Sequence, residues 1–127
     1  MAEGVVVKSF RQKIADHLAG TGQIGKLKYM AFGDGGHNSD FSPKTPNENA
    51  TGLTNELIRK ELSEVVQTDG PLSVTGKGVL EKTECVNKVI SEAALYDEKG
   101  NLVAIKNFSA KRKENDERYG VSIIFRI

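Results

Sequence analysis

The sequence predicts an α+β domain in which an N-terminal helix packs on a mainly antiparallel β-sheet or small sandwich. Apolar residues near the N-terminus recur at helical spacing, and most of the remaining chain consists of strand-like segments that follow one another. Two of these segments flank a four-residue polar turn, as in a β-hairpin. Successive strands after a helix favour an antiparallel arrangement. The length of 127 residues fits one domain, residues 1–127.

A helix is predicted over residues 5–19. Its apolar side chains fall at steps of three and four residues, which places them in one stripe, and charged side chains occupy the opposite face. The stripe is formed by Val7, Phe10, Ile14 and Leu18. Gly20 and Gly22 follow the last of these residues and mark the end of the helix.

A long loop is predicted after the first strand. Apolar and polar side chains alternate over residues 24–33, which indicates that strand. Residues 33–51 are polar, contain glycine, asparagine and proline, and follow no period, so they are predicted to form the loop. A loop of this length inside a small domain is expected to be functional or mobile, and we expect it to become ordered on assembly with other chains.

The second half of the chain is predicted to be mostly strands. Before it, residues 53–60 are predicted to form a short helix, with Leu53, Leu57 and Ile58 on one side. Strands are then predicted around residues 65–66, within 72–85, within 86–96, over 102–105 and over 119–127. The turns are predicted at residues 68–71 and 97–100, and the mixed charge run 111–118 is predicted to be a solvated loop.

The composition argues against several classes of protein. Lys and Arg number 18 and Asp and Glu number 17, so the net charge of +1 predicts neither nucleic-acid nor membrane binding. No apolar run is long enough to cross a bilayer. The single cysteine, Cys85, excludes an internal disulfide, and no serine nucleophile motif is present. The chain is therefore expected not to be an enzyme and to need no cofactor.

The long loop holds the residues most suited to binding a ligand. These candidates are Asp34, His37, Asn38, Asp40 and Phe41. Their spacing departs from a calcium loop, and a tight turn is the favoured interpretation, with positive φ at two glycines and the Asp34 side chain bonded to its own backbone. A calcium- or glycan-binding module using residues 33–51, with Phe41 as an aromatic platform, is the alternative function.

The last strand is the second candidate for an interaction surface. Its alternation places five residues on one face, Tyr119, Val121, Ile123, Phe125 and Ile127. The opposite face also carries an apolar residue, so the strand is expected to be covered, either by the core of this domain or by a partner. The edge of such a terminal strand is suited to pairing with a strand of another chain.

Four segments resemble phage tail-collar fibre proteins, in their N-terminal domain. Residues 24–36 (IGKLKYMAFGDGG) are similar to a strand and Gly-Asp-Gly turn near the start of these domains. Residues 46–62 (PNENATGLTNELIRKEL) resemble their Leu-x-Asn-Glu stretch, and residues 91–108 (SEAALYDEKGNLVAIKNF) resemble their hairpin. The ending YGVSIIFRI resembles their last strand, although Ala94 stands where the family often has glycine.

The resemblance implies a structural component of a phage, prophage or phage-tail-like particle. Such a component attaches a fibre or sits at the baseplate by protein–protein contacts, so its partners are expected to be other tail or baseplate proteins and copies of itself. Fibres of this kind are generally trimers, which implies a homotrimer or another homo-oligomer. The expected location is the virion tail or a phage-tail-like particle assembled in the bacterial cytoplasm.

Overall fold

A computed structural model describes residues 3–67 and 70–127. One helix and eight strands are formed within these ranges. In chain order they are β1 Val5–Val6, α1 Lys8–Leu18, β2 Leu27–Gly33, β3 Glu56–Glu61, β4 Glu64–Val66, β5 Ser73–Leu80, β6 Val89–Asp97, β7 Leu102–Arg112 and β8 Tyr119–Arg126. In this part of the chain, no helix has the length and apolar character needed to cross a membrane.

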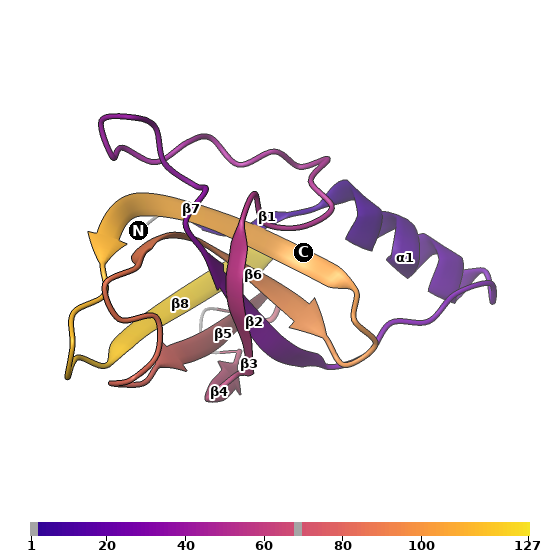
Figure 1. The fold of residues 1–127 in the computed structure, drawn as a ribbon. Coiled ribbons are helices and arrows are strands. Elements are labelled where there is room, and N and C mark those ends of the chain that lie inside the picture. The colour runs from indigo at the N-terminus through magenta and orange to yellow at the C-terminus, as the bar shows by residue number, and fades with distance from the viewer. Residues whose placement is uncertain (1–2, 68–69) are drawn as a thin grey trace.

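The strands form two antiparallel sheets. The larger sheet has five strands in the order β1-β7-β6-β2-β3, and the smaller has three in the order β4-β5-β8. Every strand pair is antiparallel. Apolar side chains from both sheets form one core between them, to which β6 contributes buried residues along almost its entire length. Figure 1 shows β7 arching over the strands of the smaller sheet.

The predicted α+β class is wrong, because the domain is nearly all β. The helix has only 11 residues, and Phe10 is its one buried side chain. It lies at one end of the molecule beside the sheets (Figure 1), so it does not form a layer of its own. The core is made by strand pairing and by the packing of the two sheets instead.

The helix predicted over residues 53–60 is also wrong. Residues 56–61 form strand β3, which pairs with β2 in a register that places Ile58 opposite Phe32. A short apolar run fits a helix or a strand by spacing alone, and pairing with the distant β2 decides between the two. The chain reaches β3 through residues 34–55, which form no helix or regular strand, so the predicted long loop is present.

Several other predictions are confirmed. Residues 8–18 of the helix predicted over 5–19 are helical, and Gly20 follows in the left-handed region with φ of 80°. Its predicted start is wrong, because Val5 and Val6 form strand β1, which pairs with β7. The predicted hairpin is formed by β6 and β7, and Gly100 closes its turn with φ of 85°. The strand predicted within residues 72–85 is β5. Part of the turn predicted at residues 68–71 lies outside the described residues, since these exclude residues 68 and 69.

The charge run at residues 111–118 is not a purely solvated loop. Strand β7 continues through Arg112, and the side chain of Lys113 is fully buried. Its Nζ donates hydrogen bonds to the backbone oxygens of Lys82 (3.3 Å) and Glu114 (3.2 Å). The buried ammonium is thus solvated by carbonyl groups and joins the start of this loop to residues 81–88.

Candidate docking surface

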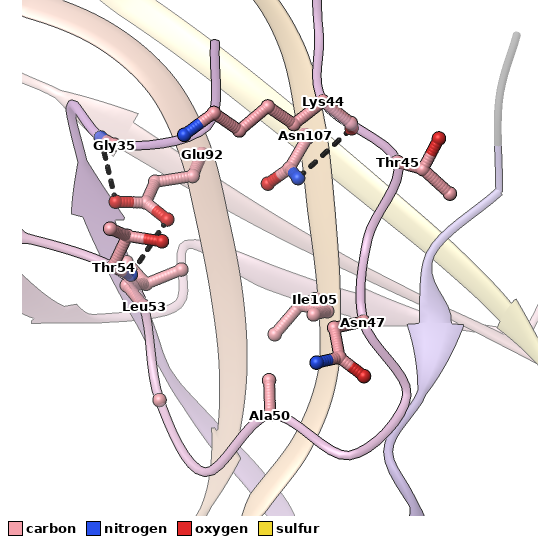
Figure 2. A pocket seen from close by; sticks show the side chains of 11 residues that line it. Gly35, Lys44, Thr45, Asn47, Ala50, Leu53, Thr54, Glu92, Ile105 and Asn107 are labelled. Atoms are coloured by element: carbon pink, nitrogen blue, oxygen red, sulfur yellow. Dashed lines mark hydrogen bonds between the residues drawn. The ribbon is translucent and has the colours of Figure 1, made fainter. Parts of the chain in front are cut away.

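The central strand β6 carries a buried carboxylate that organises the long loop. Glu92 is 2% exposed, and its side chain accepts hydrogen bonds from three backbone N–H groups. Gly35 (2.8 Å) donates from the start of the loop, and Thr54 and Asn55 (each 2.9 Å) donate from its end. Figure 2 shows the Glu92 side chain between Gly35 and Thr54. One carboxylate therefore fastens both ends of residues 34–55 to the sheet.

The two glycines at the start of this loop are required by close packing. Neither Gly35 nor Gly36 has a positive φ, so the turn mechanism predicted from the sequence is wrong. A Cβ atom at Gly36 would lie 2.4 Å from the Ser91 backbone oxygen, and one at Gly35 would lie 2.5 Å from the Thr54 Cβ. The Gly36 N–H also donates to Ser91 Oγ (2.9 Å), so the backbone of the turn rests directly on β6.

Of the predicted ligand-binding residues of the loop, Asn38 and Asp40 share Ser42 as a hydrogen-bond partner, whereas Asp34 bonds elsewhere. Asp34 accepts a hydrogen bond from the Asn55 side chain (2.7 Å) and not from its own backbone, while Asp40 accepts from the Ser42 N–H and hydroxyl (3.1 and 2.5 Å). Hydrogen bonds from Ser42 hold the pKa of Asp40 below its ordinary value. Asn38 Nδ2 donates to Ser42 Oγ (3.2 Å). The two carboxylates are therefore engaged in shaping turns.

An aromatic pair lies at the tip of the same loop. The rings of His37 and Phe41 stack with centroids 5.7 Å apart, and Phe41 is 59% exposed. His37 Nδ1 lies 2.7 Å from Ser91 Oγ, which fixes this ring to β6. Across residues 3–67 and 70–127, no three His, Cys, Asp or Glu side chains are grouped to hold a metal ion.

A small pocket lies between this loop and strand β7. Its volume is about 200 Å³, and Figure 2 shows Lys44, Asn47 and Ala50 along the loop that crosses the strand. The Asn107 side chain donates to the Lys44 backbone oxygen (3.1 Å) and so fastens the middle of the loop as well. The Glu92 carboxylate, which also lines the pocket, is held by the backbone groups described above, so this pocket is a packing gap under an anchored loop.

The predicted face of the last strand is mostly covered by the core of this domain. Val121, Ile123 and Phe125 are buried, Tyr119 is half-buried, and Ile127 is 70% exposed beyond the end of β8. Of the two alternatives for these side chains, coverage by the chain's own core is the one observed for the three buried residues. The edge of β8, by contrast, is the outer edge of the smaller sheet.

An apolar hollow lies where α1, the smaller sheet and the end of the chain meet. Its volume is about 310 Å³. It is lined by Phe10, Ile14, Ile24, Gly25, Leu27, Val65, Val74, Val103, Phe125 and Ile127. Val65 (45% exposed) and Ile127 (70% exposed) stand at its rim, and the exposed Leu72 lies beside Ile127, whose N–H bonds to the Leu72 oxygen (2.8 Å). The lining contains no charged side chain, which is typical of a surface that packs against protein.

Sequence reasoning missed this hollow. The one available signal was the pair Val65–Val66 in a short strand, because adjacent strand residues point to opposite faces and two valines cannot both face one core. The other lining residues come from the helix, the segment before β2, and β5, β7 and β8, so only the fold brings them together.

These features define a small, nearly all-β domain with an apolar hollow that is suited to contact with other proteins. The chain belongs to a known family of this kind: the family model described as phage tail-collar fibre protein, N-terminal, matches residues 1–127, the whole chain. The role of this family is structural, in the phage tail fibre, where its members associate with other tail proteins. No curated protein matches the chain.

Proposed function

We propose that this chain attaches a fibre to a phage tail or baseplate through protein–protein contacts. The observation that supports this role is the apolar hollow, with Val65 and Ile127 exposed at its rim. Exposed apolar surface of this kind is stabilised when a partner removes it from water, by about 25 cal/mol for each Å² buried. A neighbouring tail protein is the proposed occupant, because the family places the chain among such proteins.

The proposal includes the assembly in which the chain would act. The chain would work as one domain over residues 1–127, in the tail of a phage, prophage or phage-tail-like particle assembled in the bacterial cytoplasm. Self-association as a homotrimer, or as another homo-oligomer, is the proposed oligomeric state, because closed symmetry lets one surface patch serve every subunit. Family membership along the whole chain supports this setting.

Introducing charge into the apolar hollow is expected to prevent attachment. In a Val65→Asp/Ile127→Asp variant, two carboxylates would have to be desolvated when the partner packs against the rim. Each such burial costs several kcal/mol, so incorporation is expected to fall by at least about 100-fold. Particles produced with and without the variant are purified by sedimentation, and the amount of this chain per particle is measured by quantitative mass spectrometry.

The matched control is Leu18→Asp. Leu18 is 81% exposed on α1 and does not line the hollow, so the same change of chemistry there is expected to leave incorporation intact. Thermal unfolding of each purified variant shows that the chain is folded. Normal incorporation of the folded Val65→Asp/Ile127→Asp variant would contradict the proposal, as would equal loss with Leu18→Asp.

Glycan binding by the loop tip is the second candidate function. The observation that favours it is the stacked His37–Phe41 pair, which leaves Phe41 exposed as a flat apolar surface next to Asn38 and Asp40. Screening the labelled chain on an array of bacterial surface glycans is expected to give binding that Phe41→Ala abolishes. Binding that is absent, or unchanged in Phe41→Ala, would exclude this function for the loop.

A further inference from the structure

Two open strand edges face each other across a groove between β7 and β8. The groove is lined by residues 106 and 108–111 of β7 and by residues 119–122 of β8, and its volume is about 560 Å³. Strand β7 is paired with β6 at residues 102–107 and 111–112, while β8 is paired with β5. The β7 edge is not free at Ala110, whose N–H donates to the Phe41 oxygen of the long loop (3.1 Å). Within the described chain, β7 and β8 form no ladder with each other, although they follow one another in sequence.

One end of this gap is already closed by a strand of the chain itself. Val5 of β1 pairs with Ile105 of β7, and the N–H of Gly4 donates to the Ile124 oxygen of β8 (2.7 Å). The segment Gly4–Val6 therefore contacts both strands at once. A Cβ atom at Gly4 would meet the Ile123 side chain at 2.5 Å, so the fit is close. The gap at this end thus has the width of one strand, and the groove continues it along residues 106–111.

Lys106 brings to the groove a positive charge that has no matching carboxylate among the described residues. Lys106 makes no ion pair among the described residues; its Nζ donates to the backbone oxygen of Ser122 on the β8 edge (3.2 Å). Burial lowers the pKa of Lys106. The second lysine, Lys111, is paired with Glu117 (3.1 Å). No Asp or Glu side chain lines the groove.

We propose that this groove accepts an extended, acidic strand segment of a neighbouring tail protein. The segment would pair with the open edges of β7 and β8 and place a carboxylate beside Lys106. In the chain alone, the ammonium of Lys106 covers the Ser122 carbonyl, and a lysine on an open edge discourages unspecific strand pairing. A partner carboxylate would draw this ammonium away and leave the carbonyl free for a backbone N–H of the incoming strand.

This inference rests on the structural role proposed above, but it concerns a different surface. The apolar hollow is lined by α1, the smaller sheet and Ile127, whereas the groove lies between β7 and the outer edge of β8. Peptide binding by the isolated chain and incorporation into particles are therefore separate measurements. If the chain is incorporated but does not bind the peptide, the groove proposal fails. If it binds the peptide but charge in the hollow leaves incorporation unchanged, the proposed role of the hollow fails.

The test uses a fluorescent eight-residue peptide of alternating valine and threonine with one central glutamate. The untagged chain is expected to bind it at least about fivefold more tightly than the same peptide with a central lysine. In Lys106→Glu this preference is expected to reverse. Lys13→Glu, which changes an exposed lysine of α1, is the matched control and is expected to keep the original preference.

A second measurement locates the peptide on the unaltered chain and does not depend on the stability of Lys106→Glu. Amide hydrogen exchange is expected to slow within residues 106–109 and 119–122 when the glutamate peptide is present, because amides of these two segments enter a new ladder. The proposal is overturned if the peptide protects other segments, or if neither peptide protects these residues at millimolar concentration.

Discussion

Replacing Glu92 by alanine is expected to lower the free energy of unfolding by about 3–5 kcal/mol, because each buried group left unpaired costs 1–3 kcal/mol. The substitution removes the acceptor of the N–H groups of Gly35, Thr54 and Asn55, which become unpaired against the sheet. It also leaves a cavity beneath the loop. Urea unfolding followed by circular dichroism measures the change.

The release of the loop is a second expected result of Glu92→Ala. Residues 34–55 lose the contact that fastens both of their ends, so their amides are expected to exchange faster in the folded state. The matched control is Glu56→Ala, a glutamate at the start of β3 that forms an ion pair with Arg59 and is expected to change stability by less than about 1 kcal/mol. If Glu92→Ala and the unaltered chain have the same free energy of unfolding, Glu92 does not stabilise the fold by fastening the ends of the loop to the sheet.

Replacing Asp97 by alanine is expected to be similarly costly, by about 3 kcal/mol or more. Asp97 is fully buried at the end of β6 and accepts hydrogen bonds from the N–H groups of Gly25 (3.0 Å), Lys99 (2.9 Å) and Asn101 (2.8 Å). The Asn101 side chain donates to it as well (2.9 Å). The carboxylate thus shapes the hairpin turn and fastens the segment between α1 and β2.

The control for Asp97→Ala is the neighbouring Glu98→Ala, since Glu98 is exposed. Urea unfolding is expected to separate the two variants clearly. Hydrogen exchange is expected to show that Asp97→Ala frees the amides of residues 25, 99 and 101 and leaves those of residues 35 and 54–55 protected. Because the two carboxylates share no hydrogen-bond partner, the effects of Glu92→Ala and Asp97→Ala are expected to add. Loss of protection at both places in Asp97→Ala would contradict this separation.

The spacing of apolar and turn residues predicts those parts of the fold whose contacts lie between residues close in sequence. The helix at residues 8–18 follows from its apolar stripe and its glycine stop, and the β6–β7 hairpin follows from two apolar runs around Asp97–Gly100. Residues 56–61 are different, because their two adjacent apolar side chains suit either structure and only pairing with β2 makes them a strand. The predicted α+β class was wrong because the sequence does not show how much of the helix surface is buried. In the folded chain, Phe10 is the one buried side chain of the helix.

The candidate sites are less accessible to sequence reasoning. The sequence identifies the polar loop and the terminal strand, and both occur, but the roles of their residues depend on contacts between distant segments. Glu92 accepts from Gly35, which lies 57 positions away, and Asp97 accepts from Gly25, which lies 72 positions away. An oxygen-rich loop predicts Asp34 and Asp40 as candidate ligands, yet their hydrogen bonds lead to different partners.

The contacts between the segment just before β1 and strand β8 have a mechanical consequence. Gly4 bonds to Ile124, and Glu3 forms an ion pair with Arg126 (2.6 Å), so the two ends of the fold meet side by side. Tension applied between residues 3 and 126 would therefore act first on these two contacts and not on the strand pairs of the sheets. The strand pairs of the two sheets would carry such tension only after the contacts of Glu3 and Gly4 had broken.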